Sequence, residues 1–174
     1  REHLHEAGAL YKVEAGGKVT RMLDKLTITN GMAFSLDDGL LFHIDSPLRC
    51  VHAYHFHGNE GLIDEKRTVI RIPDTLGGPD GMCRDAEGKL WIAHWGGHGV
   101  HRWDPGSGEW MGKLPVPAPH VTSCAFVGPA LDHMVITTAR KEMSKDALRE
   151  FPQSGDVFIC RMPVKGTAPN LCSF

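Results

Sequence analysis

The chain has 174 residues, of which 41% are hydrophobic and 23% are charged, and its formal net charge is -2. These values are typical of a globular domain with a hydrophobic core. The sequence contains neither a cluster of Lys and Arg nor an apolar run long enough to span a bilayer, so we expect no nucleic-acid partner and no membrane association.

Turn residues separate short apolar runs along nearly the whole chain, which predicts an all-β structure built from hairpins. The paired strands are expected over residues 8–14 and 18–23, 51–56 and 67–72, and 99–105 and 110–114. A last strand is expected over residues 156–161. Only Glu142 to Phe151 has the composition of a helix, and Pro152 ends it because proline disrupts a helix interior.

One segment occurs twice, 50 residues apart, beginning with Asn30-Gly-Met in the first copy and Asp80-Gly-Met in the second. A weaker third copy begins at Ser123. Repeats of roughly 40–50 residues with about four short strands each are typical of β-propeller blades. We therefore expect about three to four blades of four-stranded antiparallel sheet. They would form one partial propeller domain over residues 1–174, with its N-terminal blades absent.

Asn30 and Asp80 occupy equivalent positions in their repeats, and equivalent positions of propeller blades can face one central axis. The two side chains would then meet at one point and offer oxygen ligands to a metal ion. The alternative is that the two motifs simply form turns, since Asn-Gly and Pro-Asp-Gly are both common turn signals. A turn does not require a carboxylate at Asp80, whereas an oxygen-ligated divalent ion does, so we favour the metal site.

The histidines offer a second possibility for metal binding. In a strand, His55 and His57 would share a face, as two zinc ligands do. The repeat pattern places them with His52 in an outer hairpin, where surface histidines are the commoner interpretation. His94 and His98 flank two glycines in a loop that could border the channel mouth and contact substrate.

Other polar and aromatic residues are expected to be structural. Asp37 and Asp85 lie next to glycines after the inner strands, which favours hairpin turns over metal ligands. Cys83 and Cys124 lie in apolar runs and are expected to be buried free thiols, which favours a reducing, cytoplasmic location. The tryptophans are expected to pack within the blades rather than to form a carbohydrate platform; they are Trp91, Trp95, Trp103 and Trp110.

Four segments of the sequence resemble the SMP-30/gluconolactonase/luciferin-regenerating family: residues 26–35, 78–92, 122–126 and 164–166. Pro79-Asp80-Gly followed by Asp85-x-x-Gly-x-Leu-Trp is the most specific of these matches. The resemblance implies a six-bladed propeller with one divalent metal in its central channel, held by a Glu of the first blade, an Asn and an Asp. Asn30 matches the metal-binding Asn. Asp80 matches the Asp that binds the metal and is proposed as the catalytic base.

The function expected from this resemblance is metal-dependent hydrolysis of a sugar-type lactone, with calcium, zinc or magnesium as the ion. The family's Glu, and a further substrate-contacting Asn and Arg, belong to a front part that this sequence does not contain. The alternative is therefore a truncated or non-catalytic calcium-binding or scaffold propeller. An incomplete ring would expose blade faces, so self-association is also expected.

Overall fold

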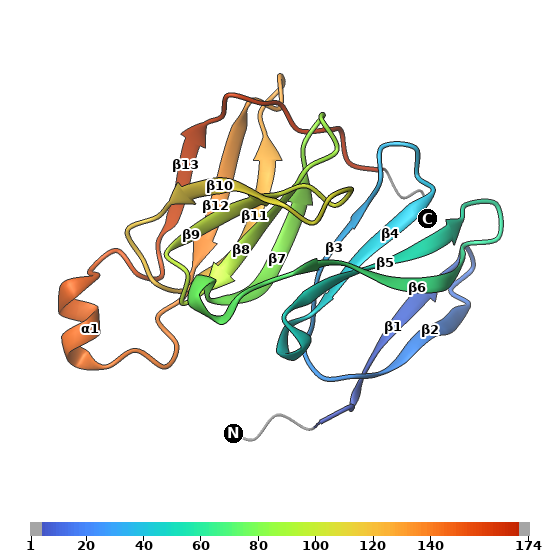
Figure 1. Cartoon of the computed structure of the whole chain (residues 1–174), viewed down its shortest axis with the longest axis horizontal. Coiled ribbons are helices and arrows are strands. Elements are labelled where there is room, and N and C mark those ends of the chain that lie inside the picture. The colour runs from blue at the N-terminus through green and yellow to red at the C-terminus, as the bar shows by residue number, and fades with distance from the viewer. Residues whose placement is uncertain (1–4, 171–174) are drawn as a thin grey trace.

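The computed structural model describes residues 5–170, which form four antiparallel sheets arranged side by side (Figure 1). The strands are β1 (Gly8–Val13), β2 (Val19–Leu26), β3 (Thr29–Phe34), β4 (Leu40–Asp45), β5 (Cys50–His57), β6 (Leu62–Arg71), β7 (Gly78–Arg84), β8 (Leu90–Trp95), β9 (Gly99–Trp103), β10 (Trp110–Pro115), β11 (Val121–Val127), β12 (His133–Thr138) and β13 (Val157–Arg161). The single α-helix of the described residues is α1 (Lys145–Glu150), and two 3-10 turns are η1 (Ser46–Leu48) and η2 (Asp74–Leu76).

Each sheet is a meander in which every strand pairs with the next one along the chain. The sheets are β1-β2, β3-β4-β5-β6, β7-β8-β9-β10 and β11-β12-β13. The two copies of the repeat are β3-β4 and β7-β8, and β11-β12 is the weaker third copy. The prediction of an all-β fold is therefore confirmed, whereas the number of blades stays a prediction.

The strand predictions hold, with differences of a few residues at several element ends, for example at β6 and α1. β6 begins at Leu62 rather than residue 67, because the register of β5 and β6 shifts between Ala53 and His55 and pairing then continues to the turn. The helix begins at Lys145 rather than Glu142. Ser144 is its N-cap and accepts a hydrogen bond from the amide of Ala147 at 3.1 Å, which fixes the first turn there.

The core lies between stacked sheets, and the alternation of side chains along β8 explains how. Leu90 and Ile92 face the β3–β6 sheet and pack among Phe42, Ile44 and other hydrophobic residues. Trp91 and Ala93 point the other way and pack against β11 and β12. Because successive side chains of a strand point to opposite faces, β8 is buried on both sides and fixes the spacing of three sheets.

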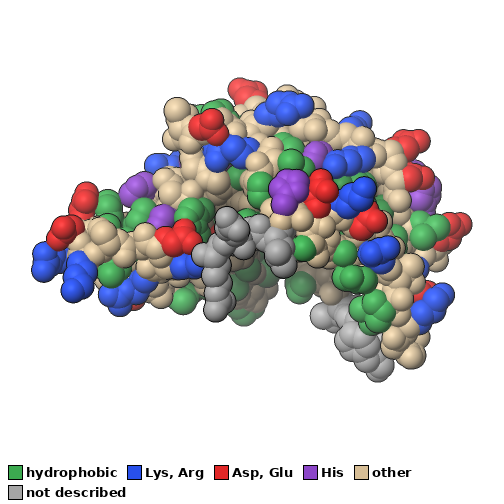
Figure 2. Space-filling model, turned by 90° about the horizontal axis from the view of Figure 1, so that it is seen from below, with side chains coloured by type: hydrophobic (Ala, Val, Ile, Leu, Met, Phe, Trp, Pro, Cys, Tyr) green, Lys and Arg blue, Asp and Glu red, His purple; other side chains and the backbone are tan. Residues whose placement is uncertain are grey.

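The two outermost sheets carry exposed apolar side chains. Tyr11, Val13 and Val19 on β1-β2 are 55%, 56% and 59% exposed, and Val157 and Ile159 on β13 are 65% and 66% exposed. Elsewhere on the surface, charged side chains of both signs are mixed with hydrophobic ones (Figure 2). Exposed apolar strand faces are sites of association. Self-association therefore stays a prediction, and we expect it to occur through β1-β2 and β13.

Several expectations about single residues are corrected. His52 is buried rather than on the surface, and Trp110 is 47% exposed rather than packed within a sheet. Cys83 and Cys124 are free, with their sulfur atoms 3.6 Å apart; Cys124 is buried and Cys83 half-buried. Cys172 lies outside the described residues. No helix of the described part is long and apolar enough to cross a membrane.

Candidate metal centre

The first strands of three sheets, β3, β7 and β11, lie side by side and carry an irregularity at equivalent places (Figure 1). The register with the neighbouring strand shifts by one residue at Asn30-Gly31 in β3, at Asp80-Gly81 in β7 and at Thr122 in β11. Such β-bulges redirect side chains and are common next to functional sites. Asn30 and Asp80 therefore lie within strands, and the interpretation of their motifs as turns is wrong.

The glycines of the two motifs allow the strands to approach closely. A Cβ on Gly31 would lie 2.6 Å from the Cβ of Met82, and a Cβ on Gly81 would lie 2.7 Å from the Cβ of Ser123. Both distances are shorter than van der Waals contact, so any side chain would push β3, β7 and β11 apart. The repeated Gly after Asn30 and Asp80 is thus explained by close packing rather than by turn geometry.

Asn30 and Asp80 line one cavity of about 370 Å³. Ser46 connects the two walls of this cavity. The Asn30 amide nitrogen donates a hydrogen bond to Ser46 Oγ at 3.2 Å, and Ser46 Oγ donates to the carbonyl oxygen of Pro79 at 2.7 Å. The sequence pattern therefore brings together the residues that it singled out, and a serine that it did not single out holds them in place.

The negative charge of an ionised Asp80 carboxylate is only partly stabilised by its surroundings. Burial raises the pKa of Asp80, and hydrogen bonding from the Asn30 side chain and the Gly81 amide lowers it by less. Desolvation therefore disfavours the ionised carboxylate. A bound cation would supply the missing compensation.

The donor atoms also suit a divalent ion. Asn30 uses its amide nitrogen toward Ser46 and Asp80, which leaves its carbonyl oxygen as a neutral ligand. With a carboxylate beside it, the pair offers the hard oxygen donors that calcium and magnesium prefer and that zinc accepts. At the equivalent bulge of the third repeat stands the uncharged Thr122, whose hydroxyl pairs with that of Thr137 at 2.8 Å.

Several residues of the cavity wall were missed by sequence reasoning. Trp95 lines the cavity and stacks on His120, with ring centroids 4.1 Å apart. Lys141 and Glu142 reach the same cavity from the segment between β12 and α1. Lys141 and Glu142 lie outside the repeat, and a single sequence carries no signal for the path of their segment.

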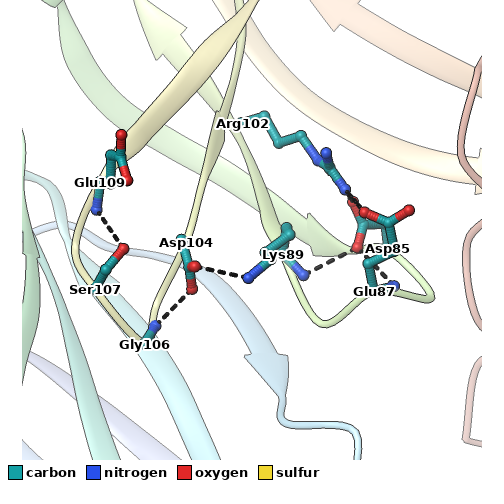
Figure 3. Close-up of polar contacts among 8 residues, drawn as sticks. All are labelled: Asp85, Glu87, Lys89, Arg102, Asp104, Gly106, Ser107 and Glu109. Carbon is teal, nitrogen blue, oxygen red and sulfur yellow. Dashed lines mark hydrogen bonds and ion pairs between the residues drawn. The ribbon is translucent and has the colours of Figure 1, made fainter.

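The remaining candidates are structural. Asp85 is fully buried, and its carboxylate accepts hydrogen bonds from the backbone of Glu87 and Lys89 and from Arg102 at 2.6 Å (Figure 3). It also accepts a hydrogen bond from Trp91 Nε1 at 2.9 Å. The Asp-x-x-Gly-x-Leu-Trp motif is thus a closed turn, as expected. Asp37 accepts from Ser35 and Gly39 in the matching turn of the first repeat.

The possibility that His94 contacts substrate is not supported, because this residue of β8 is fully buried. It stacks on His101 at a centroid distance of 3.9 Å, and its Nδ1 lies 2.8 Å from the carbonyl oxygen of Leu76. Burial lowers the pKa of His94 to about 3 and that of His101 to about 4. His98 packs against Phe151 instead of lining the cavity.

Stacked antiparallel sheets whose first strands meet at a shared cavity define a propeller-like all-β protein. A family model for the SMP-30/gluconolactonase/LRE-like region matches residues 1–140. Human regucalcin is 37% identical over 163 residues, which are 93% of this chain and 54% of regucalcin.

Two solved structures agree with this match. Regucalcin from Agrobacterium tumefaciens, a calcium-binding protein, has a TM-score of 0.89 at 32% identity, covering 96% of this chain and 56% of its own. A gluconolactonase from Xanthomonas campestris has a TM-score of 0.63 at 30% identity, covering 74% and 41%. The chain belongs to the SMP-30/gluconolactonase/LRE-like family. It spans about half the length of the relatives it matches.

Proposed function

We propose that the protein is a divalent-metal-dependent hydrolase that opens a sugar-type lactone at the cavity of Asn30 and Asp80. The observation that carries the proposal is the convergence of these two repeat-equivalent oxygen ligands on one cavity. Membership of a family that includes gluconolactonases supports the type of reaction.

Asp80 has two proposed roles, as the charged metal ligand and as the base that accepts a proton from water. The charge of a bound ion would favour the ionised Asp80 carboxylate, which is the form that can accept a proton from water. Asn30 is proposed as the neutral ligand, oriented by Ser46. A bound divalent ion would polarise the lactone carbonyl and lower the pKa of a bound water.

The proposed ion is calcium, magnesium or zinc. Two protein oxygens are fewer than any of these ions takes up, so the complete site needs further ligands. The family resemblance assigns a Glu ligand, and an Asn and an Arg that contact substrate, to a region outside these 174 residues. Full activity is therefore proposed to depend on that region, and the free thiols favour a cytoplasmic location.

A second candidate function is calcium binding without catalysis. It is favoured by the calcium-binding relative from Agrobacterium tumefaciens and by the small ligand set within this chain. Both candidates require Asp80 for metal binding, but only the first requires turnover of a lactone.

The test is hydrolysis of a sugar lactone by the protein that contains this chain, after chelation and after return of calcium, magnesium or zinc individually. Asp80→Ala should lower the rate by about 10²–10⁴-fold or more, because a base and a ligand are both lost. Asn30→Ala should have a smaller effect. Asp37→Asn, in an exposed turn, is the matched control and should leave the rate unchanged.

Activity that survives chelation, or that Asp80→Ala leaves intact, would contradict the proposal. Calcium binding that depends on Asp80, without any turnover, would favour the second candidate.

A further inference from the structure

A second group of metal-type ligands lies on the outer β5–β6 hairpin, on a different part of the β3–β6 sheet from Asn30. His55 and His57 of β5 and Asp64 of β6 each offer one donor atom, and the three atoms lie within 4.8 Å of one another. We propose that these residues form a second metal site, which binds a transition-metal ion of the zinc type independently of the site at Asp80.

The fold assembles this group by means of a β-bulge. His55 and His57 are two residues apart in a strand and so share a face. Ala53 pairs with Arg67 but His55 pairs with Asp64, so β6 holds one extra residue between these pairs. Without the extra residue, position 65 would stand opposite His55 and Asp64 would point to the other face.

The bulge carries backbone strain that a plain hairpin does not need. Glu65 has a φ of 47°, in the left-handed region that non-glycine residues rarely adopt. Strained residues and bulges are found where a side chain must be held in a particular direction. Here the residue whose direction they set is Asp64, the single carboxylate of the group.

Two donor distances, each to a different carboxylate oxygen of Asp64, are near the ligand separations of a tetrahedral site. Asp64 Oδ2 lies 2.9 Å from His57 Nε2, and Asp64 Oδ1 lies 3.5 Å from His55 Nδ1. Ligands about 2.1 Å from a tetrahedral ion are separated by about 3.4 Å. The two rings are nearly perpendicular, at 80°, with their centroids 4.5 Å apart, so small side-chain rotations would suffice to close the site.

The chemistry of the ligands separates this site from the cavity. Two imidazoles with one carboxylate suit zinc and neighbouring first-row ions, whereas calcium and magnesium prefer oxygen ligands. Three protein ligands leave the fourth position of zinc open to water. The side chains are 38–54% exposed, so an ion can enter from solvent without a conformational change and would join β5 to β6.

The test is calorimetric titration of the chain with Zn²⁺ in an Asp80→Asn background, which removes the charged ligand of the cavity. One Zn²⁺ per chain is expected. Loss of a residue that merely supports a ligand costs about 10–100-fold in affinity, so His57→Gln and Asp64→Asn should each weaken binding at least about tenfold. The matched control is His133→Gln, since His133 contacts Asp132 at 2.8 Å on the surface but has no second histidine partner in that pair.

Circular dichroism of each variant checks that the sheets are intact. Zinc affinity that is unchanged in His57→Gln and Asp64→Asn, or that falls equally in His133→Gln, would overturn the proposal. A failure of lactone hydrolysis would leave it untouched, because neither ligand set shares a residue with the other.

Discussion

Asp80 lies near the start of β7 and Asp85 directly follows its end, and the environments of the two aspartates are opposite. Beyond the far end, Asp85 is fully buried and accepts hydrogen bonds from backbone amides and Arg102 (Figure 3). Trp91 donates a further hydrogen bond to it. At the inner end, Asp80 is half-buried, and desolvation outweighs its hydrogen bonds. Saturated hydrogen bonding identifies a carboxylate that holds the fold together. A buried carboxylate with incomplete compensation identifies one that is available for a ligand.

The largest predicted effect on stability is at Asp85. Asp85→Ala should lower the free energy of unfolding by about 3–5 kcal/mol, because Arg102 would lose the buried partner of its ion pair. Urea unfolding of the purified variant measures this loss. Asp37→Ala, in the exposed equivalent turn, should cost under about 1 kcal/mol, and equal effects of the two variants would contradict the comparison.

On β8 and β9, the stacked rings of His94 and His101 predict that the stability of the fold is sensitive to acid. Burial lowers their pKa values to about 3 and about 4, so the unfolded chain, with histidine pKa near 6.5, binds protons first. Stability should be complete above pH 6.5 and fall as the pH drops toward 4. The expected loss at pH 5 is about 2 kcal/mol per histidine. Urea midpoints at pH 7 and pH 5 test this, and His101→Gln should make the fall shallower.

At the inner end, the close approach of strands predicts that Gly81→Ala costs about 1–3 kcal/mol, because the new Cβ would overlap Ser123. Gly39→Ala is the matched control. A Cβ there would lie 3.4 Å or more from its nearest neighbour, so thermal unfolding should change little. A midpoint for Gly81→Ala as high as that of the parent would show that β7 and β11 can separate.

The smallest effect has the opposite sign to the first. A raised pKa means that the folded state disfavours ionised Asp80, so at pH 7 without metal the carboxylate lowers stability. Asp80→Asn should therefore raise the thermal midpoint slightly in the presence of a chelator, whereas Asp85→Asn should lower it. A lower midpoint for Asp80→Asn would show that Asp80, like Asp85, stabilises the fold, and would contradict the comparison.

The sequence allowed the strands, the sheets and the meeting of Asn30 with Asp80 to be predicted, because each depends on a repeated pattern. Alternating side chains and turn residues define strands locally. Equivalent positions in stacked repeats are brought together by the repetition itself. The predicted roles of the two residues remain proposals.

The bulges could not be predicted, because Asn-Gly and Asp-Gly have the same local signal in a turn as in a closely packed strand. The pairing of Asp64 with His55 could not be predicted either, because a register shift of one residue in β6 decides which side chain stands opposite His55. Ser46, Trp95, Lys141 and Glu142 reach the cavity through loops and strand ends, where single-sequence patterns do not define direction. Likewise His52 and Trp110 differ from expectation because burial depends on the neighbouring sheet.

The most direct test of the central claim is calorimetric titration of the chain with Ca²⁺, which prefers oxygen ligands over the histidines of the outer hairpin. We predict one weak site, with a dissociation constant of about 10⁻⁴–10⁻³ M because few charged ligands are present. Binding should be lost in Asp80→Asn, weakened in Asn30→Ala and unchanged in Asp37→Asn. Calcium binding that persists unchanged in Asp80→Asn would contradict the assignment of the cavity as the metal site.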